Sequence, residues 1–338
     1  MISTKENTIH TDRSWEKIIM RYNKPDLRKS LWQILNTFIP YVGLWIVMYF
    51  SLQYSYWITL LLSLPAAGLL IRLFIIFHDC GHGSFFRSKK ANDITGILMG
   101  ILTFTPYSPW HFSHRVHHAT AGNLDKRGVG DVWTLTVEEY LARSKQDRFI
   151  YRMYRHPLVM FTIGSLYMVL IVNRFSRKKM DRNSRMSVYV TNIGLLVVAV
   201  LLSLWIGVKA YLLIQIPVIL ISHSAGIWLF YVQHQFDDVT WDRSHQWDYK
   251  NAAIKGSSFL KLPSILQWFT GNIGFHHVHH LSPKIPNYNL ARCHYENALF
   301  REVKPITLLS SFSTLHLRLW DEAARKMVGF RKPALLRR

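Results

Sequence analysis

Residues 30–71 read SLWQILNTFIPYVGLWIVMYFSLQYSYWITLLLSLPAAGLLI and contain no charged side chain. As one straight helix, this stretch would measure roughly 60 Å, about twice the hydrocarbon thickness of a membrane. Two antiparallel spans must therefore share it. The polar and aromatic residues at 51–57 predict the turn, because Tyr and Trp favour the membrane interface. We place the two spans at about 33–52 and 57–77.

A second apolar block, residues 188–236, is interrupted only by Lys209 and is again long enough for two helices. We place these at about 188–208 and 210–234, with the turn near 205–211. The sequence therefore predicts an all-α membrane protein. Its four transmembrane helices form two hairpins, accompanied by interfacial helices and by a cytosolic helical cap that holds the functional site.

The distribution of Lys and Arg predicts the orientation. The 338 residues include 41 Lys and Arg against 20 Asp and Glu, a net charge of +21, yet 49% of them are hydrophobic. A nucleic-acid binder would rarely combine this charge with such long apolar runs, so that class is excluded. Lys209 is the only Lys or Arg in the two expected outer turns, which places both termini and the site in the cytosol. We expect the cytoplasmic membrane of a bacterium as the location.

The spans and the charges together predict the domain organisation. The expected parts are a cytosolic N-terminal segment (1–32), the transmembrane hairpins (33–236) with a cytosolic loop between them (78–187), a second cytosolic region (237–325) and a basic tail (326–338). Two cysteines are too few for a disulfide framework, which excludes a small secreted domain. No signal-peptide pattern is present in the first 29 residues, so we expect the mature chain to begin at or near Met1.

Two further apolar segments, 94–109 and 156–173, are not expected to cross the membrane. The first has too few apolar residues before its prolines. The second is long enough to cross, but it is flanked by Arg155 and Arg174, which favours a helix in the interface or a shallow re-entrant one. If either segment crossed alone, the histidine motifs described next would be divided between the two sides of the membrane.

Histidine is frequent, with 17 residues, and three short motifs concentrate it. HDCGH (78–82) carries a pair, whereas HRVHH (114–118) and HHVHH (276–280) each carry the triplet HxxHH. On a helix, the first histidine of a triplet lies beside the other two, and the adjacent pair diverges by about 100°. An adjacent pair can therefore serve two metal ions. Burying so many imidazoles singly would be costly, whereas shared metal ions satisfy them together.

The ligand type narrows the choice of metal. The zinc-protease pattern HExxH is excluded because Asp79 stands where a glutamate is required. A structural zinc site would use only four ligands, and half of these histidines would then bind no metal. Imidazole suits iron and copper, and roughly eight or nine nitrogens match a dinuclear centre. We expect two iron ions with dioxygen as the oxidant, and copper stays open on ligand type alone.

Longer stretches around these motifs resemble the membrane fatty acid desaturase family. HDCGHGSFF (78–86), SPWHFSHRVHHATAGNLD (108–125) and GNIGFHHVHHLSPKIPNY (271–288) resemble its three histidine boxes in their usual order, and FYVQHQFDD (230–238) is similar to the segment that supplies one further ligand. The amino-acid sequence of these stretches is most similar to the acyl-lipid branch of the family. The resemblance implies nine metal ligands: His78, His82, His114, His117, His118, His234, His276, His279 and His280.

Residues around the boxes receive secondary roles. Five hydrogen-bonding residues next to a box are candidates to orient the imidazoles through their other ring nitrogen: Asp79, Asn123, Asp125, Asp237 and Asn272. Cys80 is interpreted as a packing residue rather than a ligand, because its side chain should point away from the two histidines of its box. The histidines left outside the ligand set are His10, His111, His156, His223, His245, His277, His294 and His316.

The resemblance implies an oxidoreductase that introduces a cis double bond into the acyl chain of a membrane lipid, with no catalytic residue beyond the metal ligands. Two electrons should come from an external ferredoxin, or from a b-type cytochrome with its reductase, because the chain has no dinucleotide-binding fingerprint of its own. Two alternatives stay open. One is a hydroxylase or ketolase of lipids, alkanes or carotenoids, and the other is a metal transporter or sensor.

Overall fold

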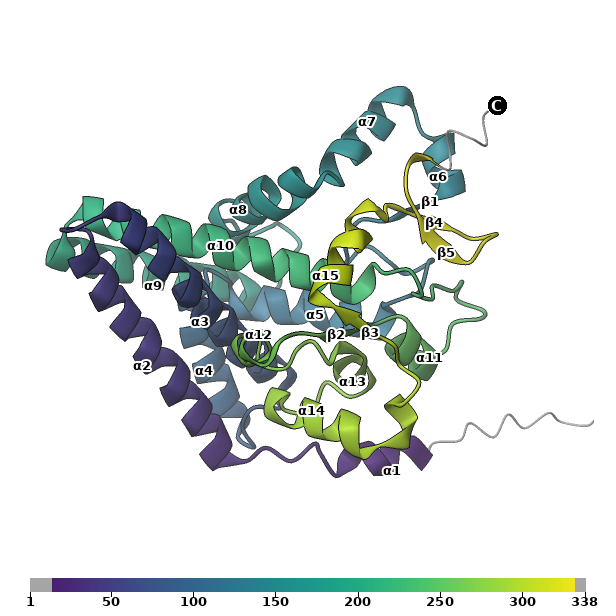
Figure 1. The fold of residues 1–338 in the computed structure, drawn as a ribbon, viewed down its shortest axis with the longest axis horizontal. Helices are drawn as coiled ribbons and strands as arrows, with labels where there is room; N and C mark the ends of the chain where they lie inside the picture. The colour runs from purple at the N-terminus through teal and green to yellow at the C-terminus, as the bar shows by residue number, and fades with distance from the viewer. Residues whose placement is uncertain (1–13, 332–338) are drawn as a thin grey trace, which may run out of the picture.

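The computed structural model describes residues 14–331, so His10 and most of the predicted basic tail lie outside the described residues. Within this range, four helices are long and apolar enough to cross a membrane, as the sequence predicted, and they are consistent with a multi-pass membrane protein. They lie together at one end of the molecule (Figure 1). Their bounds are α2 (Leu27–Ser51), α3 (Tyr56–His82), α9 (Arg182–Ile206) and α10 (Val208–His234).

The ends of these helices follow from local capping. The Asp26 side chain accepts hydrogen bonds from the backbone N–H groups of Arg28 and Lys29, so α2 begins six residues before the predicted span. At the other end of the hairpin, α3 continues through the first histidine box and ends at Gly83, whose φ of 63° is the left-handed conformation that glycine adopts readily. The first box therefore lies on a membrane helix and not in the loop that follows it.

The remaining helices are short, and most of them form a helical cap at the other end of the molecule (Figure 1). The α-helices are α1 (Ser14–Met20), α4 (Lys89–Leu102), α5 (Tyr107–Thr120), α6 (Val137–Ala142), α7 (Lys145–Tyr154), α8 (Gly164–Leu170), α11 (Tyr249–Lys255), α12 (Ser264–Phe269), α13 (His276–Leu281), α14 (Asn287–Glu296) and α15 (Leu308–Ser311). A π-helical turn, Val159–Ile163, precedes α8, and 3₁₀ turns lie at Val172–Arg174, Ala298–Phe300 and Phe312–His316.

The sequence did not predict five very short strands in the cap. These are β1 (Leu135–Thr136), β2 (Phe259–Lys261), β3 (Pro305–Thr307), β4 (Leu319–Asp321) and β5 (Lys326–Val328). One sheet has the order β1-β4-β5, in which Leu135 pairs with Leu319 in parallel and β4 pairs with β5 antiparallel. β2 and β3 form a second, parallel pair. The two sheets tie the C-terminal segment to the central loop and to the chain around the third box.

The two apolar segments that are not expected to cross the membrane, 94–109 and 156–173, differ in structure. Most of the first segment lies in α4, whose fourteen residues span about 21 Å and are too short to cross the hydrocarbon layer. The second segment lies mainly in a helical stretch, 159–174, which is bent by 65° against the preceding α7. If α7 and this stretch are counted as one unit, they are together long and apolar enough to be a fifth span. That the second segment does not cross stays a prediction.

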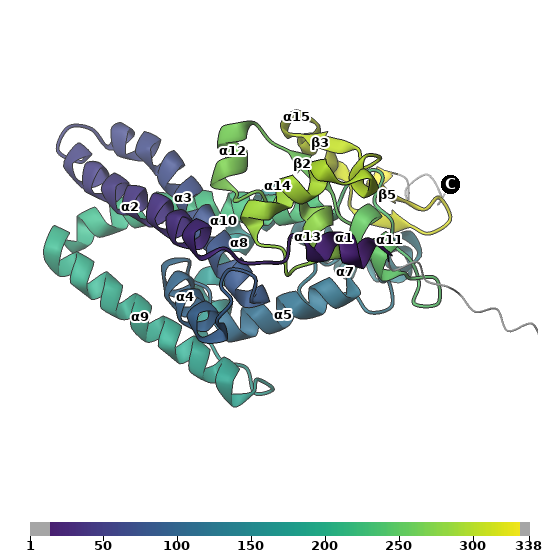
Figure 2. The same ribbon diagram turned by 90° about the horizontal axis from the view of Figure 1, so that it is seen from below.

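α3 is the central helix of the bundle. Of its apolar stretch, 56% is buried inside the protein, against 6% for α9, which diverges from α2 in Figure 2. α3 packs against α2, α4 and α10, and its inner face forms the main core with residues such as Leu73, Phe77 and Cys80. Cys80 is thus a buried packing residue with a free thiol, as expected. The core continues directly into the first histidine box.

A candidate metal centre built from nine histidines

Four helices bring nine histidines together at the boundary between the long helices and the cap. α3 contributes His78 and His82 from its end, α10 contributes its last residue, His234, and α5 and α13 carry the two triplets. Each of the nine is at most 9% exposed. They are the nine positions that the resemblance to the desaturase boxes implied, and the structure places all of them in one buried cluster.

The cluster divides into two groups, in each of which the candidate ligand atoms lie within 4.8 Å of one another. The five-histidine group consists of His78, His82, His114, His118 and His279, and the four-histidine group consists of His117, His234, His276 and His280. The adjacent residues of both triplets are separated between the groups, as the divergence of neighbouring side chains on a helix requires. Two groups of this size provide for two metal ions.

The distances between ring nitrogens fit a metal ion. In the four-histidine group, the Nε2 atom of His234 lies 3.0 Å from the Nε2 atoms of both His117 and His276. In the other group, the Nε2 atom of His118 lies 3.1 Å from that of His114 and 3.0 Å from that of His279. A metal–nitrogen bond of about 2.1 Å separates two ligands at right angles by about 3.0 Å. These nitrogens therefore lie at the spacing of neighbouring ligands around one ion.

Unpartnered ring nitrogens support the same conclusion. The Nε2 atoms of His82 and His280, one from each group, are buried and have no hydrogen-bond partner among residues 14–331. A buried polar atom without a partner costs about 1–3 kcal/mol, and a bound metal ion removes that cost. Nine imidazoles without a carboxylate ligand are a donor set that suits iron, and the residues present therefore fit two such ions.

The cap also keeps its histidines neutral. Burial, followed by the proximity of other imidazoles, lowers the pKa well below its ordinary value of 6.5 for five residues outside the membrane spans. These are His114, His118, His276, His279 and His280. A neutral imidazole is the form that binds a metal ion, so the site is ready for metal at neutral pH.

One carboxylate orients a histidine in each group. The Nδ1–H of His78 donates to Oδ1 of Asp79 at 3.0 Å, and the second oxygen of Asp79 accepts from the backbone and side-chain N–H groups of Asn287 at 2.7 and 2.8 Å. In the four-histidine group, the Nδ1–H of His117 donates to Oδ1 of Asp131 at 2.5 Å. Each bond fixes the tautomer that leaves Nε2 free for a metal ion.

Asp131 is not among the predicted orienting residues, because it lies fourteen residues after His117, outside the flanks of the box. The chain returns through a glycine turn, in which the Gly128 N–H donates to the second oxygen of Asp131 at 3.0 Å. Gly130, with a φ of 79°, passes so close to α5 that a Cβ there would lie 2.7 Å from the carbonyl oxygen of Ser113. The pattern GVGD was therefore the available signal.

The side chains of the other four candidate orienting residues form no hydrogen bond to the nine imidazoles. Asn123 accepts from the Ser244 hydroxyl, and Asp125 forms an ion pair with Arg243 at 2.7 Å. The side chain of Asn272 donates to the carbonyl of Asn287 at 3.3 Å, and Asp237 is exposed in the loop after α10. Asn123 and Asn272 instead shape the backbone that follows or precedes a box.

The left-out histidines that the structure describes lie outside both groups. His277 is buried but faces away from the centre, and its Nε2 atom lies 2.9 Å from Nδ1 of His294. His223 lies within α10 and bonds to the carbonyls of Ile219 and Thr103. His111 lies on α5 beside Gly81, one turn before the second box. None of these three joins the two metal-binding groups.

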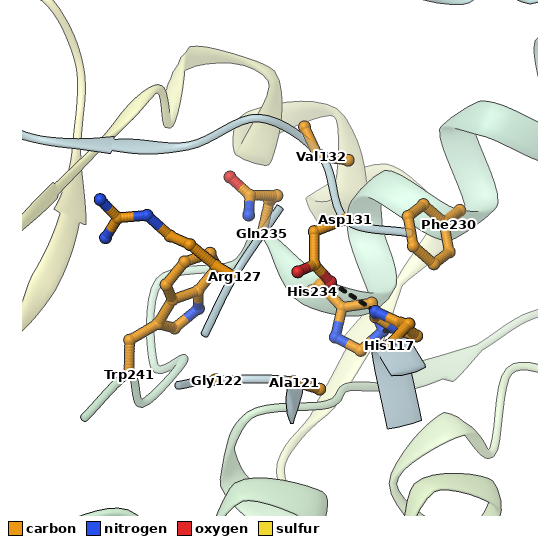
Figure 3. Close-up of a pocket in the computed structure, with 10 residues that line it drawn as sticks. All are labelled: His117, Ala121, Gly122, Arg127, Asp131, Val132, Phe230, His234, Gln235 and Trp241. Carbon is orange, nitrogen blue, oxygen red and sulfur yellow. Dashed lines mark hydrogen bonds and ion pairs between the residues drawn. The ribbon is translucent and has the colours of Figure 1, made fainter. Parts of the chain in front are cut away.

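A small cavity adjoins the four-histidine group (Figure 3). Asp131, His117 and His234 converge on one side of it, and Arg127 and Trp241 lie on the other. Its volume of about 10 Å³ is enough for roughly one water molecule.

The aromatic ring of Phe230 lies 5.1 Å from that of His117, while Trp110 stacks on His114 at 4.4 Å in the other group. Each group therefore packs against an aromatic ring.

Asp131→Asn is expected to weaken metal binding at the four-histidine group. An amide that can donate no longer holds the Nδ1–H tautomer of His117, and loss of such an orienting contact typically costs about 10–100-fold in metal affinity. The measurement is the metal content of the purified variant after dialysis against increasing chelator. Asp125→Asn, at an exposed ion pair near the same box, is the matched control and should retain metal like the unmodified protein. Equal retention by both variants would refute the orienting role.

Comparisons with known proteins show which sequences this chain is similar to. The pattern of the family described as "Fatty acid desaturase" matches residues 54–306. The chain is 49% identical over 328 residues to a protein named fatty acid desaturase from Bacillus subtilis, covering 97% of this chain and 93% of that protein. It is 25% identical to an sn-1 oleoyl-lipid 12-desaturase from Synechocystis sp. (84% and 81% covered) and 27% identical to an sn-1 acyl-lipid omega-3 desaturase (ferredoxin) from Nostoc sp. (65% and 62% covered).

Proposed function

Because the chain belongs to the fatty acid desaturase family, we propose that it introduces a cis double bond into an acyl chain that is already part of a membrane lipid. Membership of this family implies an oxidoreductase. The relatives from Synechocystis and Nostoc are named as enzymes of oleoyl-lipids and acyl-lipids, which supports a lipid-bound substrate. The observation that carries the proposal is the pair of buried histidine groups at the end of the membrane helices.

The proposed reaction needs a cofactor. Each of the two groups would hold one iron ion through its imidazoles, with His78 and His117 fixed by their carboxylates. When bound, the two ions supply the redox chemistry by which dioxygen removes two hydrogens from neighbouring methylenes. Overall, one acyl –CH₂–CH₂– unit, one dioxygen, two electrons and two protons give –CH=CH– and two waters. Both oxygen atoms are reduced to water, and the acyl chain supplies two of the four electrons.

The protein has to select one pair of methylenes by position, since no polarity or acidity distinguishes carbons in the middle of an acyl chain. An apolar cavity of about 330 Å³ lies between α2, α4, α9 and α10, within the membrane-spanning part of the molecule. Its walls include Trp45, Leu102 and Leu202. We propose that this region, together with Trp110 beside the five-histidine group, guides the acyl chain without admitting water.

The electrons are proposed to come from a soluble carrier on the cytosolic side. One relative is named for its use of ferredoxin, and a b-type cytochrome with its reductase is the other expected donor. With both termini and the cap in the cytosol of a bacterial cell, the excess of Lys and Arg outside the spans attracts an acidic carrier. The same charges also favour contact with anionic lipid head groups.

Expression in a host without polyunsaturated lipids, followed by mass analysis of its fatty acids, tests the proposed function. We expect acyl chains that are two mass units lighter, each with one new double bond at a fixed position in the lipid fraction. Formation of hydroxylated or keto lipids without a new double bond would contradict the proposal and would favour the hydroxylase or ketolase. Metal uptake by the purified protein in vesicles without oxygen would instead favour a transporter.

A further inference from the structure

The short helix α12 exposes an apolar surface immediately before the third histidine box. Ile265, Leu266 and Trp268 are 67%, 37% and 38% exposed. No charged side chain is present between Lys261 and Lys284. An uncharged segment of this kind, next to the membrane helices, needs an apolar environment to cover it.

The contacts of α12 with α3 define the depth at which it lies. The ring of Phe269 fills the space beside Gly68, where a Cβ would lie 2.7 Å from the ring. Gly68 is eleven residues after Trp57, which the sequence predicts at the outer interface, and this corresponds to about 16 Å along the helix. Half of the hydrocarbon layer is about 15 Å thick. The end of α12 is therefore packed against α3 near the middle of the membrane.

One helical turn further along α3, Arg72 fixes the position of Trp268. Its guanidinium group donates to the backbone carbonyl of Trp268 and, at 3.1 Å, to Oγ1 of Thr37, and it lies 4.2 Å above the indole ring of Trp268. Arg72 is only 7% exposed. A charged side chain within a membrane helix is costly unless polar groups of the protein satisfy it. The carbonyl at the end of α12 provides such a group.

The contact continues towards the metal centre on the same face of α3. The backbone of Gly271 passes so close that a Cβ there would lie 2.7 Å from Ile75. Gly68, Arg72 and Ile75 are spaced by four and three residues, so they lie on one helical face, and Asp79 with its bond to Asn287 follows them. The segment that leads into the third box and follows it therefore contacts α3 at successive turns, from Gly68 to Asp79.

We propose that α12 is embedded in the membrane leaflet nearest the metal centre, with Ile265, Leu266 and Trp268 in contact with lipid acyl chains. Figure 1 shows α12 beside α3. The occupant of this surface is the bilayer, because the contacts of Phe269 with Gly68 and of Trp268 with Arg72 lie within the predicted span of α3. Through this insertion, α12 holds the following helix, α13, at the same depth as His78 at the end of α3. This inference concerns lipid contact and does not depend on which reaction the metal centre performs.

A nitroxide label on Ile265→Cys tests the insertion. The protein is reconstituted in phosphatidylcholine vesicles, and collisions of the label with oxygen, which is concentrated in lipid, are compared with collisions with a water-soluble nickel chelate. Leu201→Cys, 60% exposed on α9, is the lipid-facing control, and Ala323→Cys, exposed in the β4–β5 turn, is the water-facing control. The native Cys80 and Cys293 are buried and should remain unlabelled.

We expect the oxygen-to-nickel collision ratio at position 265 to resemble that at 201 and to exceed that at 323 several-fold. A ratio like that at 323 would show that α12 lies in water and would overturn the proposal. Weak collisions with both reagents would show that protein, either a second copy or another partner, covers α12, and would also overturn it. The product analysis of the proposed function is independent of each of these results.

Discussion

Replacing His117 with alanine is expected to abolish desaturation and to leave one tightly bound metal ion in place of two. His117 provides one of only four imidazoles in its group, and its Nε2 atom lies 3.0 Å from that of His234. Loss of a residue that merely orients a ligand costs about 10–100-fold, so loss of the ligand itself should lower product formation by at least about a hundredfold. Fatty acid analysis and metal analysis of the same preparation provide the measurement.

Two further variants make this result specific. His245→Ala carries the same substitution at an exposed histidine outside both groups and should retain full activity and metal content. His118→Ala alters the neighbouring residue but removes a nitrogen from the five-histidine group. It should therefore also lose one ion. The ion that remains should be the one in the four-histidine group, whereas His117→Ala should leave the ion in the five-histidine group, so the two variants should differ in their spectra. Full activity of His117→Ala would refute the ligand assignment.

The metal-free protein is expected to lose stability steeply as the pH falls below 6.5. The five buried histidines of α5 and α13 have pKa values well below the ordinary 6.5, so between these values the unfolded chain binds more protons than the folded one. Each such group lowers the free energy of unfolding by up to about 1.4 kcal/mol per pH unit. Five together approach roughly 7 kcal/mol per unit, which is comparable with the whole stability of many domains.

The measurement is the thermal midpoint of the chelator-treated protein in detergent at a series of pH values. It should vary little between pH 7 and 8, where these histidines are neutral in both states, and fall sharply below pH 6.5. The metal-bound protein should withstand lower pH, because bound metal competes with protons for the same nitrogens. A midpoint that stays constant from pH 8 to 5 without metal would show that the imidazoles are not buried as described.

The sequence predicted the parts of this structure that depend on local patterns. Long uncharged blocks are sufficient to locate four membrane helices, and the spacing within HRVHH was sufficient to predict that His117 and His118 point in different directions. The exact helix ends depended on caps such as Asp26, which a search for apolar residues does not reveal. The family resemblance added His234, whose ring the motif spacing alone could not associate with the triplets.

The features that the sequence did not predict depend on contacts between distant residues. Asp131 reaches His117 only because a tight turn at Gly130 returns the loop to α5. The strands have two or three residues each, too few for a recognisable alternation, and they pair across gaps as long as that from Leu135 to Leu319. The contact of Arg72 with Trp268 spans 196 residues, so the depth of α12 follows from the fold alone.

The number of metal ions in each purified chain tests the central claim most directly. Elemental analysis, with the protein quantified by amino-acid analysis, should give two ions for each chain, and both should be iron. Either ion should be lost separately through a substitution in its own histidine group. One ion or none for each fully active chain would contradict the assignment of nine histidines to two sites, and two copper ions would contradict the choice of iron.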